Sequence, residues 1–215
     1  MVPWMPIVVF FHLCTFNIFG LSDNDFNHSQ IPSRIGEFSQ LRYLNLAQPG
    51  ENTFFGEVPP QVSHLRNLLI LDLRSYFEYI PPNPIKLQLK ISTLRSLIQN
   101  ATSLEVLRHS FVTISSSIPD MLTNLTSLRK LELFHCVLYG EFPIERFFKL
   151  KMLNNLGLSG NKLSLFPGIS SSNETFPPIQ NLGLRSCNLH GEIPSWIMNL
   201  TDLAYLDLEY NNLQG

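Results

Sequence analysis

One pattern of apolar residues recurs along this chain. Residues 127–143, SLRKLELFHCVLYGEFP, return in altered form at 178–194 as PIQNLGLRSCNLHGEIP and, shortened, at 202–215 as DLAYLDLEYNNLQG. The shared frame is L-x-x-L-x-L-x-x-[N/C]-x-L-x-G-x-[I/F]-P. A recurring unit of this length predicts a solenoid, in which each repeat buries its apolar face against the next repeat.

The last apolar position of L-x-x-L-x-L marks each repeat. These positions are Leu21, Leu46, Leu73, His109, Leu133, Leu158, Leu184 and Leu208. Six of the seven steps are 24 to 27 residues, a period typical of leucine-rich repeats. The frame therefore predicts an α/β fold, a curved leucine-rich-repeat solenoid. Its parallel strands would form the concave face, and short helical or 3-10 turns would form the convex side.

We expect the repeat domain to cover residues 16–215 in about eight repeats. The step from Leu73 to His109 is 36 residues and contains an irregular insertion at 74–98 with a proline-rich start. Within it the apolar spacing first alternates, as in a strand, and then suits a helical turn. The last repeat stops before its closing x-I-P, so the sequence is interpreted as a fragment of a longer protein with its last repeat truncated.

Residues 1–15 form a hydrophobic segment without a charged side chain. A signal sequence is the favoured interpretation, with Ile7 to Leu13 as its apolar stretch. No basic residue precedes this stretch, because the first one is Arg34. A membrane anchor and an irregular start of the first repeat are the alternatives, and Pro3 and Pro6 weigh against the anchor.

One position in the turn after each strand favours a buried polar side chain, because the turn leaves backbone groups that need hydrogen-bond partners. This predicted asparagine ladder consists of Asn24, Cys136, Asn161, Cys187 and Asn211. The two cysteines are two repeats apart, which is roughly 10 Å at the strand spacing and too far for a disulfide. We expect both thiols to be buried and unpaired.

The residues around the inward leucines of each strand should be exposed on the concave face, and Asp72 and Arg74 are among them. Aromatic side chains beside arginine are frequent anchors of protein interfaces. A cluster of Phe111, Phe134 and His135, with Arg108 and Arg129 alongside, is therefore the favoured contact for a peptide or protein. The candidate binding residues of this face are Arg108, Phe111, Arg129, Phe134, His135, Tyr205 and Tyr210.

Five sequences fit the N-x-[S/T] acceptor pattern for N-linked glycans. They begin at Asn27, Asn100, Asn124, Asn173 and Asn199. Asn100, Asn124 and Asn199 share one repeat phase, four residues before the first consensus leucine. That phase lies away from the strand face, so a glycan there would leave the concave side open.

Catalysis finds little support in the sequence, and we expect neither an enzyme nor a cofactor. The six histidines are far apart in the repeat frame, and no zinc-protease, hydrolase or phosphate-loop motif occurs. The net charge of -2, with 15% charged residues and no basic stripe, disfavours nucleic acid as a partner.

The L-x-G-E-[I/F]-P form at 138–143 and 189–194 resembles the plant extracellular leucine-rich repeat. The opening LSDNDFNHSQIPSRIGEFSQLRYLNL is similar to the first repeats of plant receptor-like proteins of the pathogen-resistance kind. The resemblance implies a cell-surface defence receptor that enters the secretory pathway and belongs to a membrane-anchored parent protein. It also implies a peptide or protein ligand and co-receptor kinases as partners. The alternatives are a receptor-kinase ectodomain and a secreted inhibitor of microbial wall-degrading enzymes, and the missing cysteine-paired caps weigh against the inhibitor.

Overall fold

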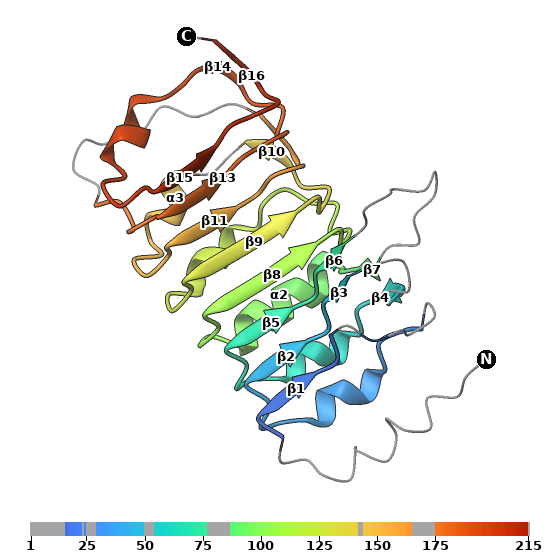
Figure 1. Ribbon diagram of the computed structural model, residues 1–215. Helices are drawn as coiled ribbons and strands as arrows, with labels where there is room; N and C mark the ends of the chain where they lie inside the picture. The colour runs from blue at the N-terminus through green and yellow to red at the C-terminus, as the bar shows by residue number, and fades with distance from the viewer. Residues whose placement is uncertain are drawn as a thin grey trace.

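The chain folds into a solenoid of strands and short helical turns, seen in a computed structural model (Figure 1). The structure describes residues 16–22, 24, 29–49, 54–76, 87–141, 144–164 and 175–214. Residues 1–15, which the sequence analysis interprets as a signal sequence, lie outside the described residues. Within the described part, no helix combines the length and the apolar character needed to cross a bilayer.

Eight strands form one sheet, and every neighbouring pair in it is parallel, as predicted. In spatial order the strands are β1 (Ile18–Gly20), β2 (Tyr43–Asn45), β5 (Ile70–Asp72), β8 (Val106–Ser110), β9 (Lys130–Phe134), β11 (Asn155–Gly157), β13 (Asn181–Gly183) and β15 (Tyr205–Asp207). The middle leucine of one strand pairs in register with that of the next, for example Leu131 with Leu156. The strand order follows the chain, so each repeat contributes one strand.

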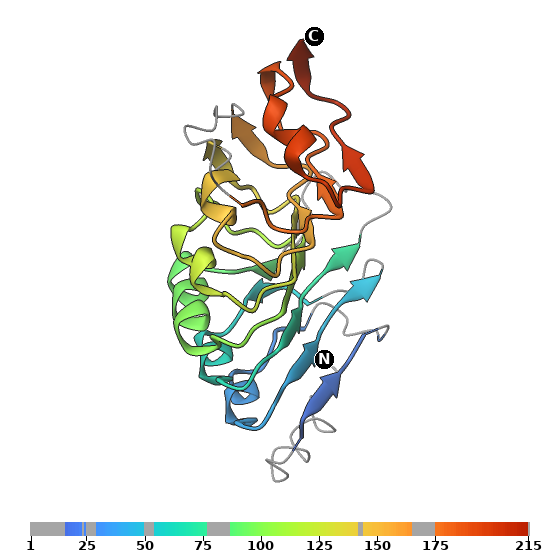
Figure 2. The ribbon, with the colours of Figure 1, turned by 90° about the vertical axis from the view of Figure 1, so that its left-hand side faces the viewer.

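The helical turns lie on the side opposite the sheet in the middle repeats (Figure 2). Four are 3-10 helices: η1 (Ser33–Glu37), η2 (Pro60–His64), η3 (Asp120–Asn124) and η4 (Ser195–Asn199). A proline with φ between -63° and -74° precedes each of them, at Pro32, Pro59, Pro119 and Pro194. Because the proline ring restricts φ to this range, it favours the start of a helical turn. This explains why the frame ends in [I/F]-P.

Four pairs of short parallel strands lie beside the main sheet. They are β3 (Gln48–Pro49) with β6 (Ser75–Tyr76), β4 (Gly56–Glu57) with β7 (Leu87–Gln88), β10 (Tyr139–Glu141) with β12 (Lys162–Ser164), and β14 (His190–Glu192) with β16 (Asn212–Gln214). The frame glycines Gly140 and Gly191 have φ of 93° and 92°. Residues with a side chain larger than a hydrogen atom rarely adopt such φ values. This explains why the frame has a glycine two residues before [I/F]-P.

The long step between β5 and β8 contains α2 (Ile91–Asn100), an amphipathic helix of 10 residues. It buries Leu94, Leu97 and Ile98 against the solenoid, in agreement with the helical spacing of that segment. A second short helix, α3 (Ile144–Phe147), follows β10. The helix α2 thus lies between β5 and β8 in the chain, while β8 stays in register with β5 on the concave side.

The core is a continuous column of leucines between the sheet and the helical turns. The marker positions Leu46, Leu73, Leu133, Leu158 and Leu184 are buried, and Leu208 is partly buried. His109 occupies the same column and is fully buried. The solenoid therefore places a histidine where its neighbouring repeats place leucine.

Candidate binding face

The outward side chains of the eight-stranded sheet form the concave face. Strand register aligns its central column as Gly20, Asn45, Asp72, Arg108, Glu132, Gly157, Gly183 and Asp207. The column therefore divides into a charged part on β5, β8 and β9, two glycines on β11 and β13, and a carboxylate on β15.

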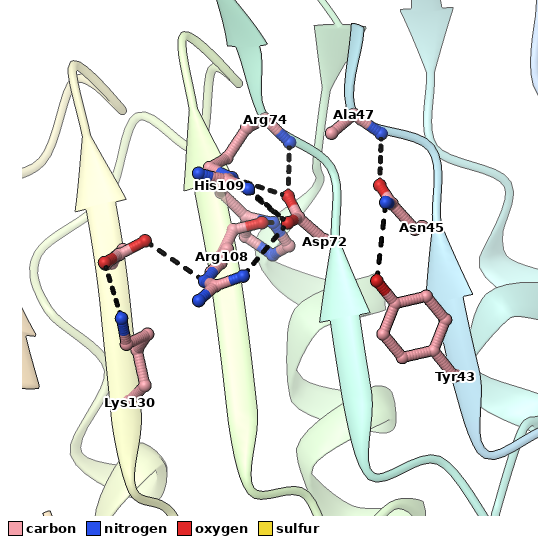
Figure 3. A network of polar contacts seen from close by, with 9 residues as sticks. Tyr43, Asn45, Ala47, Asp72, Arg74, Arg108, His109 and Lys130 are labelled. Atoms are coloured by element: carbon pink, nitrogen blue, oxygen red, sulfur yellow. Dashed lines mark hydrogen bonds and ion pairs between the residues drawn. The ribbon is translucent and has the colours of Figure 1, made fainter. Parts of the chain in front are cut away.

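Five side chains form a charge network on the charged part of this column (Figure 3). Arg108 lies between two carboxylates, 3.5 Å from Asp72 and 3.3 Å from Glu132. Arg74 contacts Asp72 at 2.8 Å, and Lys130 contacts Glu132 at 3.4 Å. Because three basic and two acidic groups alternate across three strands, the network is held in one arrangement and retains an excess of positive charge.

Asp72 is the anchor of the charge network. The sequence analysis expects its side chain to be exposed, and this expectation is wrong, because only 2% of the side chain is accessible. Its carboxylate accepts hydrogen bonds from the Arg74 backbone N–H at 3.2 Å and from the Arg74 guanidinium. The guanidinium groups of Arg74 and Arg108 cover it, so the carboxylate exchanges water for charged donors.

His109 lies directly behind the charge network. Its Nδ1–H donates to the Arg108 carbonyl oxygen at 2.7 Å, and among the described residues its Nε2 has no hydrogen-bond partner. Burial lowers the pKa of His109 from 6.5 to about 4, and the Arg108 carbonyl and the Asp72 charge oppose this shift. The imidazole is therefore neutral at physiological pH, which agrees with its place in the leucine column.

The structure brings Phe111, Phe134 and His135 together at the ends of two strands: Phe111 follows β8, Phe134 is the last residue of β9, and His135 follows β9. Phe111 and His135 stack with ring centroids 4.6 Å apart, at 7° between their planes. A Cβ added to Gly160 would lie 2.2 Å from the His135 ring, so this ring lies on the Gly160 backbone. In the same way, a Cβ at Gly157 would lie 2.5 Å from the Phe134 ring. The side chains of Phe134 and His135 therefore each pack against a glycine of the following repeat.

Arg129 does not join this aromatic group. It immediately precedes β9, whereas Phe134 is the last residue of that strand. Its guanidinium lies 3.6 Å from the Glu105 carboxylate, at the N-terminal end of the strands, whereas Phe134 lies at their C-terminal end. Arg108, in contrast, belongs to the charge network beside Phe134. The candidate cluster thus retains one of its two arginines.

Tyr205 and Tyr210 lie at the far end of the face, on β15 and just after it. They are 55% and 73% exposed. The Arg185 guanidinium lies 4.3 Å from the centre of the Tyr210 ring and also contacts the Glu209 carboxylate. The Tyr205 hydroxyl donates to Asp207 at 3.3 Å, and the negative charge of Asp207 raises the pKa of Tyr205. In the strand order, β15 is three positions from β9 and four from β8, so both tyrosines are remote from the Phe111–His135 stack.

The predicted asparagine ladder joins the turns of adjacent repeats. Asn161 accepts from the backbone N–H groups of Cys136 and Leu138 at 3.1 and 3.0 Å, and it donates to the carbonyls of Leu133 and Leu158. Asn211 repeats this pattern on the Cys187 turn. Asn24 is exposed and donates to the carbonyls of its own turn. The buried asparagines therefore satisfy backbone groups of two repeats at once.

Neither Cys136 nor Cys187 forms a disulfide, and both are fully buried. The Cys187 sulfur lies 3.2 Å from the Leu158 carbonyl, and the Cys136 sulfur lies 3.5 Å from the His109 carbonyl. Asn161 and Asn211 donate to the equivalent carbonyls of their preceding repeats. Burial raises the pKa of the Cys187 thiol to about 11, so the thiol stays protonated.

The three described sequon asparagines differ in their surroundings. Asn124 and Asn199 end the 3-10 helices η3 and η4, and both are exposed. Asn100 ends α2, is half-buried, and donates its side-chain N–H to the Ser63 carbonyl at 2.8 Å. Asn27 and Asn173 lie outside the described residues. Although the three sequons share one repeat phase, the Asn100 side chain is therefore less accessible to solvent than those of Asn124 and Asn199.

No binding role for Gly157 or Gly183, and no ion pairing of Asp72, Arg74 and Glu132, is predicted from the sequence. The glycines carry a signal in the sequence, because both occupy the x of L-x-L in consecutive repeats. The ion pairs of Arg108 with Asp72 and Glu132 carry none at the level of one repeat, since their members are on different strands. Among the described residues, no group of three or more His, Cys, Asp and Glu side chains could hold a metal ion.

A family model described as leucine-rich repeat region matches residues 4–215, and the chain belongs to this family. Receptor-like protein 6 of Arabidopsis thaliana is 32% identical over 194 residues, which cover 88% of this chain and 18% of that protein. Receptor-like protein 9DC1 of Solanum pimpinellifolium is 31% identical over 208 residues, which cover 95% of this chain and 22% of that protein. The predicted resemblance to plant receptor-like proteins is confirmed, and the chain spans about a fifth of the length of these relatives.

The fold is also similar to a solved receptor ectodomain. The Arabidopsis receptor kinase HAESA, in complex with the peptide hormone IDA and the co-receptor SERK1, superposes with a TM-score of 0.68 at 27% sequence identity. The match covers 95% of this chain and 35% of that chain. The predicted leucine-rich-repeat solenoid is thus confirmed by both the family and the three-dimensional similarity.

Proposed function

We propose that this chain is the ligand-binding leucine-rich-repeat module of a plant cell-surface receptor-like protein in defence signalling. The observation that carries the proposal is the preformed concave face. There a charge network and an aromatic group lie side by side on one sheet. Side chains already held in one arrangement lose little entropy on binding, which favours recognition of a partner.

The partner would be a peptide or protein ligand, with co-receptor kinases completing the signalling complex. HAESA supports this idea, because its structure contains a peptide hormone and a co-receptor bound to a similar solenoid. The same similarity favours a receptor-kinase ectodomain as the second candidate. In both cases the chain acts by binding and not by catalysis.

A secretory route and a membrane-anchored parent protein follow from the same proposal. Asn124 and Asn199 are exposed on turns away from the sheet, so glycans there would leave the concave face accessible. We expect both to carry glycans when the chain is expressed in plant cells. Mass spectrometry of tryptic peptides, with Asn124→Gln and Asn199→Gln as controls, tests this expectation.

Binding is tested with the full chain and a library of random peptides displayed on phage. Peptides retained by the chain are synthesised, and their affinities are measured by calorimetry for Arg108→Ala, Phe134→Ala and Met198→Ala. Met198 is an exposed side chain in η4 on the convex side, so it serves as the control. We expect the two concave substitutions to weaken binding at least tenfold, a typical result for anchor residues. Unchanged affinity for both would refute the concave face as the binding surface.

A further inference from the structure

The central column of the concave face contains one carboxylate that no basic side chain neutralises among the described residues. Asp72 and Glu132 belong to the charge network, whereas Asp207 accepts hydrogen bonds from the Tyr205 hydroxyl and the Glu209 backbone N–H. The nearest arginine along the face, Arg185, is held by Glu209 and Tyr210. Among the described residues, Asp207 therefore has no ion-pair partner.

The position beside Asp207 in the same column is a glycine without a side chain, Gly183, and we call this gap in the column the Gly183 notch. Gly183 is the register neighbour of Asp207 on β13, and Gly157 follows on β11. The Phe134 ring covers Gly157 but ends short of Gly183. A Cβ at Gly183 would lie 3.4 Å from the Ser159 hydroxyl, 3.7 Å from the Gly157 Cα and 4.0 Å from the Phe134 Cε1. These are ordinary contact distances, so the space above Gly183 can receive a side chain.

We propose that this Gly183 notch, between the Phe134 ring and the Asp207 carboxylate, receives a lysine or arginine side chain of the bound partner. The inference rests on the proposed binding function and specifies the chemistry of one contact. A long basic side chain has an apolar stem and a charged end. The stem would pack on the Gly183 backbone beside the edge of the Phe134 ring, and the charged end would reach Asp207.

Charge and shape both favour this occupant over an acidic or a purely apolar one. An acidic group would face Asp207 directly and would be repelled. An apolar group would remove water from Asp207 without replacing its hydrogen bonds, which is costly. A cation forms a charge-assisted hydrogen bond there instead. The raised pKa of Tyr205, caused first by Asp207, agrees with a negative potential at this end of the face.

The first experiment asks which residues bound peptides share. Random peptides displayed on phage are selected on the full chain and, in parallel, on Asp207→Asn. We expect one position rich in lysine or arginine among peptides from the unchanged chain and not among those from Asp207→Asn. Asp202→Asn, which removes an exposed carboxylate in the turn before β15, should leave the enrichment intact.

The second experiment measures the contact itself. Calorimetry compares a selected lysine peptide with its norleucine analogue, which keeps the stem and lacks the charge. We expect Asp207→Asn to weaken the lysine peptide at least tenfold and the norleucine peptide less than threefold. Gly183→Leu should weaken both peptides by filling the notch. Gly20→Leu is the matched control, because Gly20 occupies the same column in β1 with open space around it.

The two proposals fail in different ways. If peptides lose affinity for Arg108→Ala or Phe134→Ala but show no basic position and no response to Asp207→Asn, the inference is wrong and the proposed function stands. Enrichment of an aromatic position sensitive only to Gly183→Leu would also overturn the basic occupant. If no peptide binds the concave face at all, both proposals fail.

Discussion

Phe111 and His135 stack face to face although they belong to adjacent repeats and both have left-handed backbone conformations, with φ of 58° and 51°. Gly160, Ser186 and Tyr210 follow at the same repeat position with φ of 75°, 53° and 55°. The turn after the strand thus imposes positive φ from β8 onward. At Phe111 and His135, this backbone conformation directs the two side chains so that their rings contact each other.

The stack predicts a measurable coupling between its two members. Replacing Phe111 and His135 by alanine, singly and together, should give a double-mutant cycle with an interaction free energy of about 1 kcal/mol in favour of the pair. Urea denaturation monitored by circular dichroism provides the free energies of unfolding. Additive effects of the two substitutions would show that the rings touch without stabilising the fold.

The charge network predicts a strong dependence of stability on Asp72. Asp72→Ala should lower the free energy of unfolding by about 3 kcal/mol, because two partly buried guanidinium groups lose their shared carboxylate. The control is Arg34→Ala, which breaks an exposed pair between Arg34 and Glu37 and should cost less than about 0.5 kcal/mol. Similar losses in the two variants would mean that the network is no more important than an ordinary surface pair.

The asparagine ladder predicts that Asn161 is the most sensitive of its polar members. Asn161→Ala removes bonds to four backbone groups in two repeats and should cost about 3 kcal/mol. Asn24→Ala, at the exposed equivalent, should change stability by less than about 0.5 kcal/mol. Hydrogen exchange of the Cys136 and Leu138 amides should accelerate in Asn161→Ala. Unchanged exchange there would contradict the role assigned to its side-chain oxygen.

Because burial lowers the pKa of His109, we expect the folded chain to lose stability in mild acid. This pKa is about 4 in the folded chain and near 6.5 when unfolded, so the unfolded state binds the proton first as pH falls. The contribution of His109 is complete above pH 6.5, declines between pH 6.5 and about 4, and is constant below that. The difference amounts to about 3 kcal/mol.

The measurement is the free energy of unfolding from pH 8 to pH 3.5 for the unchanged chain and for His109→Leu. The difference between the two curves should shrink as pH rises and level off above pH 6.5. His64→Gln removes an exposed histidine and serves as the control. Parallel curves for the unchanged chain and His109→Leu would refute the buried neutral imidazole.

The repeat frame was sufficient to predict the parallel sheet, the leucine column and the polar turn position. These features depend on what each repeat has in common with the next, and a period of 24 to 27 residues records that directly. The helical part of the insertion is also predicted from the sequence, because the apolar spacing of α2 is that of a helix. Periodic features of this kind need no knowledge of individual contacts.

The chemistry of the concave face depended instead on contacts between repeats. Asp72 is buried because Arg74 and Arg108 cover it, and the Phe134 ring reaches the next strand because Gly157 has no side chain there. Asn100 differs from Asn124 because Ser63, 37 residues earlier in the chain, presents a carbonyl to it. A single repeat shows which side chains face outward, but their rotamers follow from the residues that the solenoid places opposite them. Apart from Arg74, which is two residues from Asp72, those partners are about one repeat or more away in the chain, so only the folded arrangement brings them together.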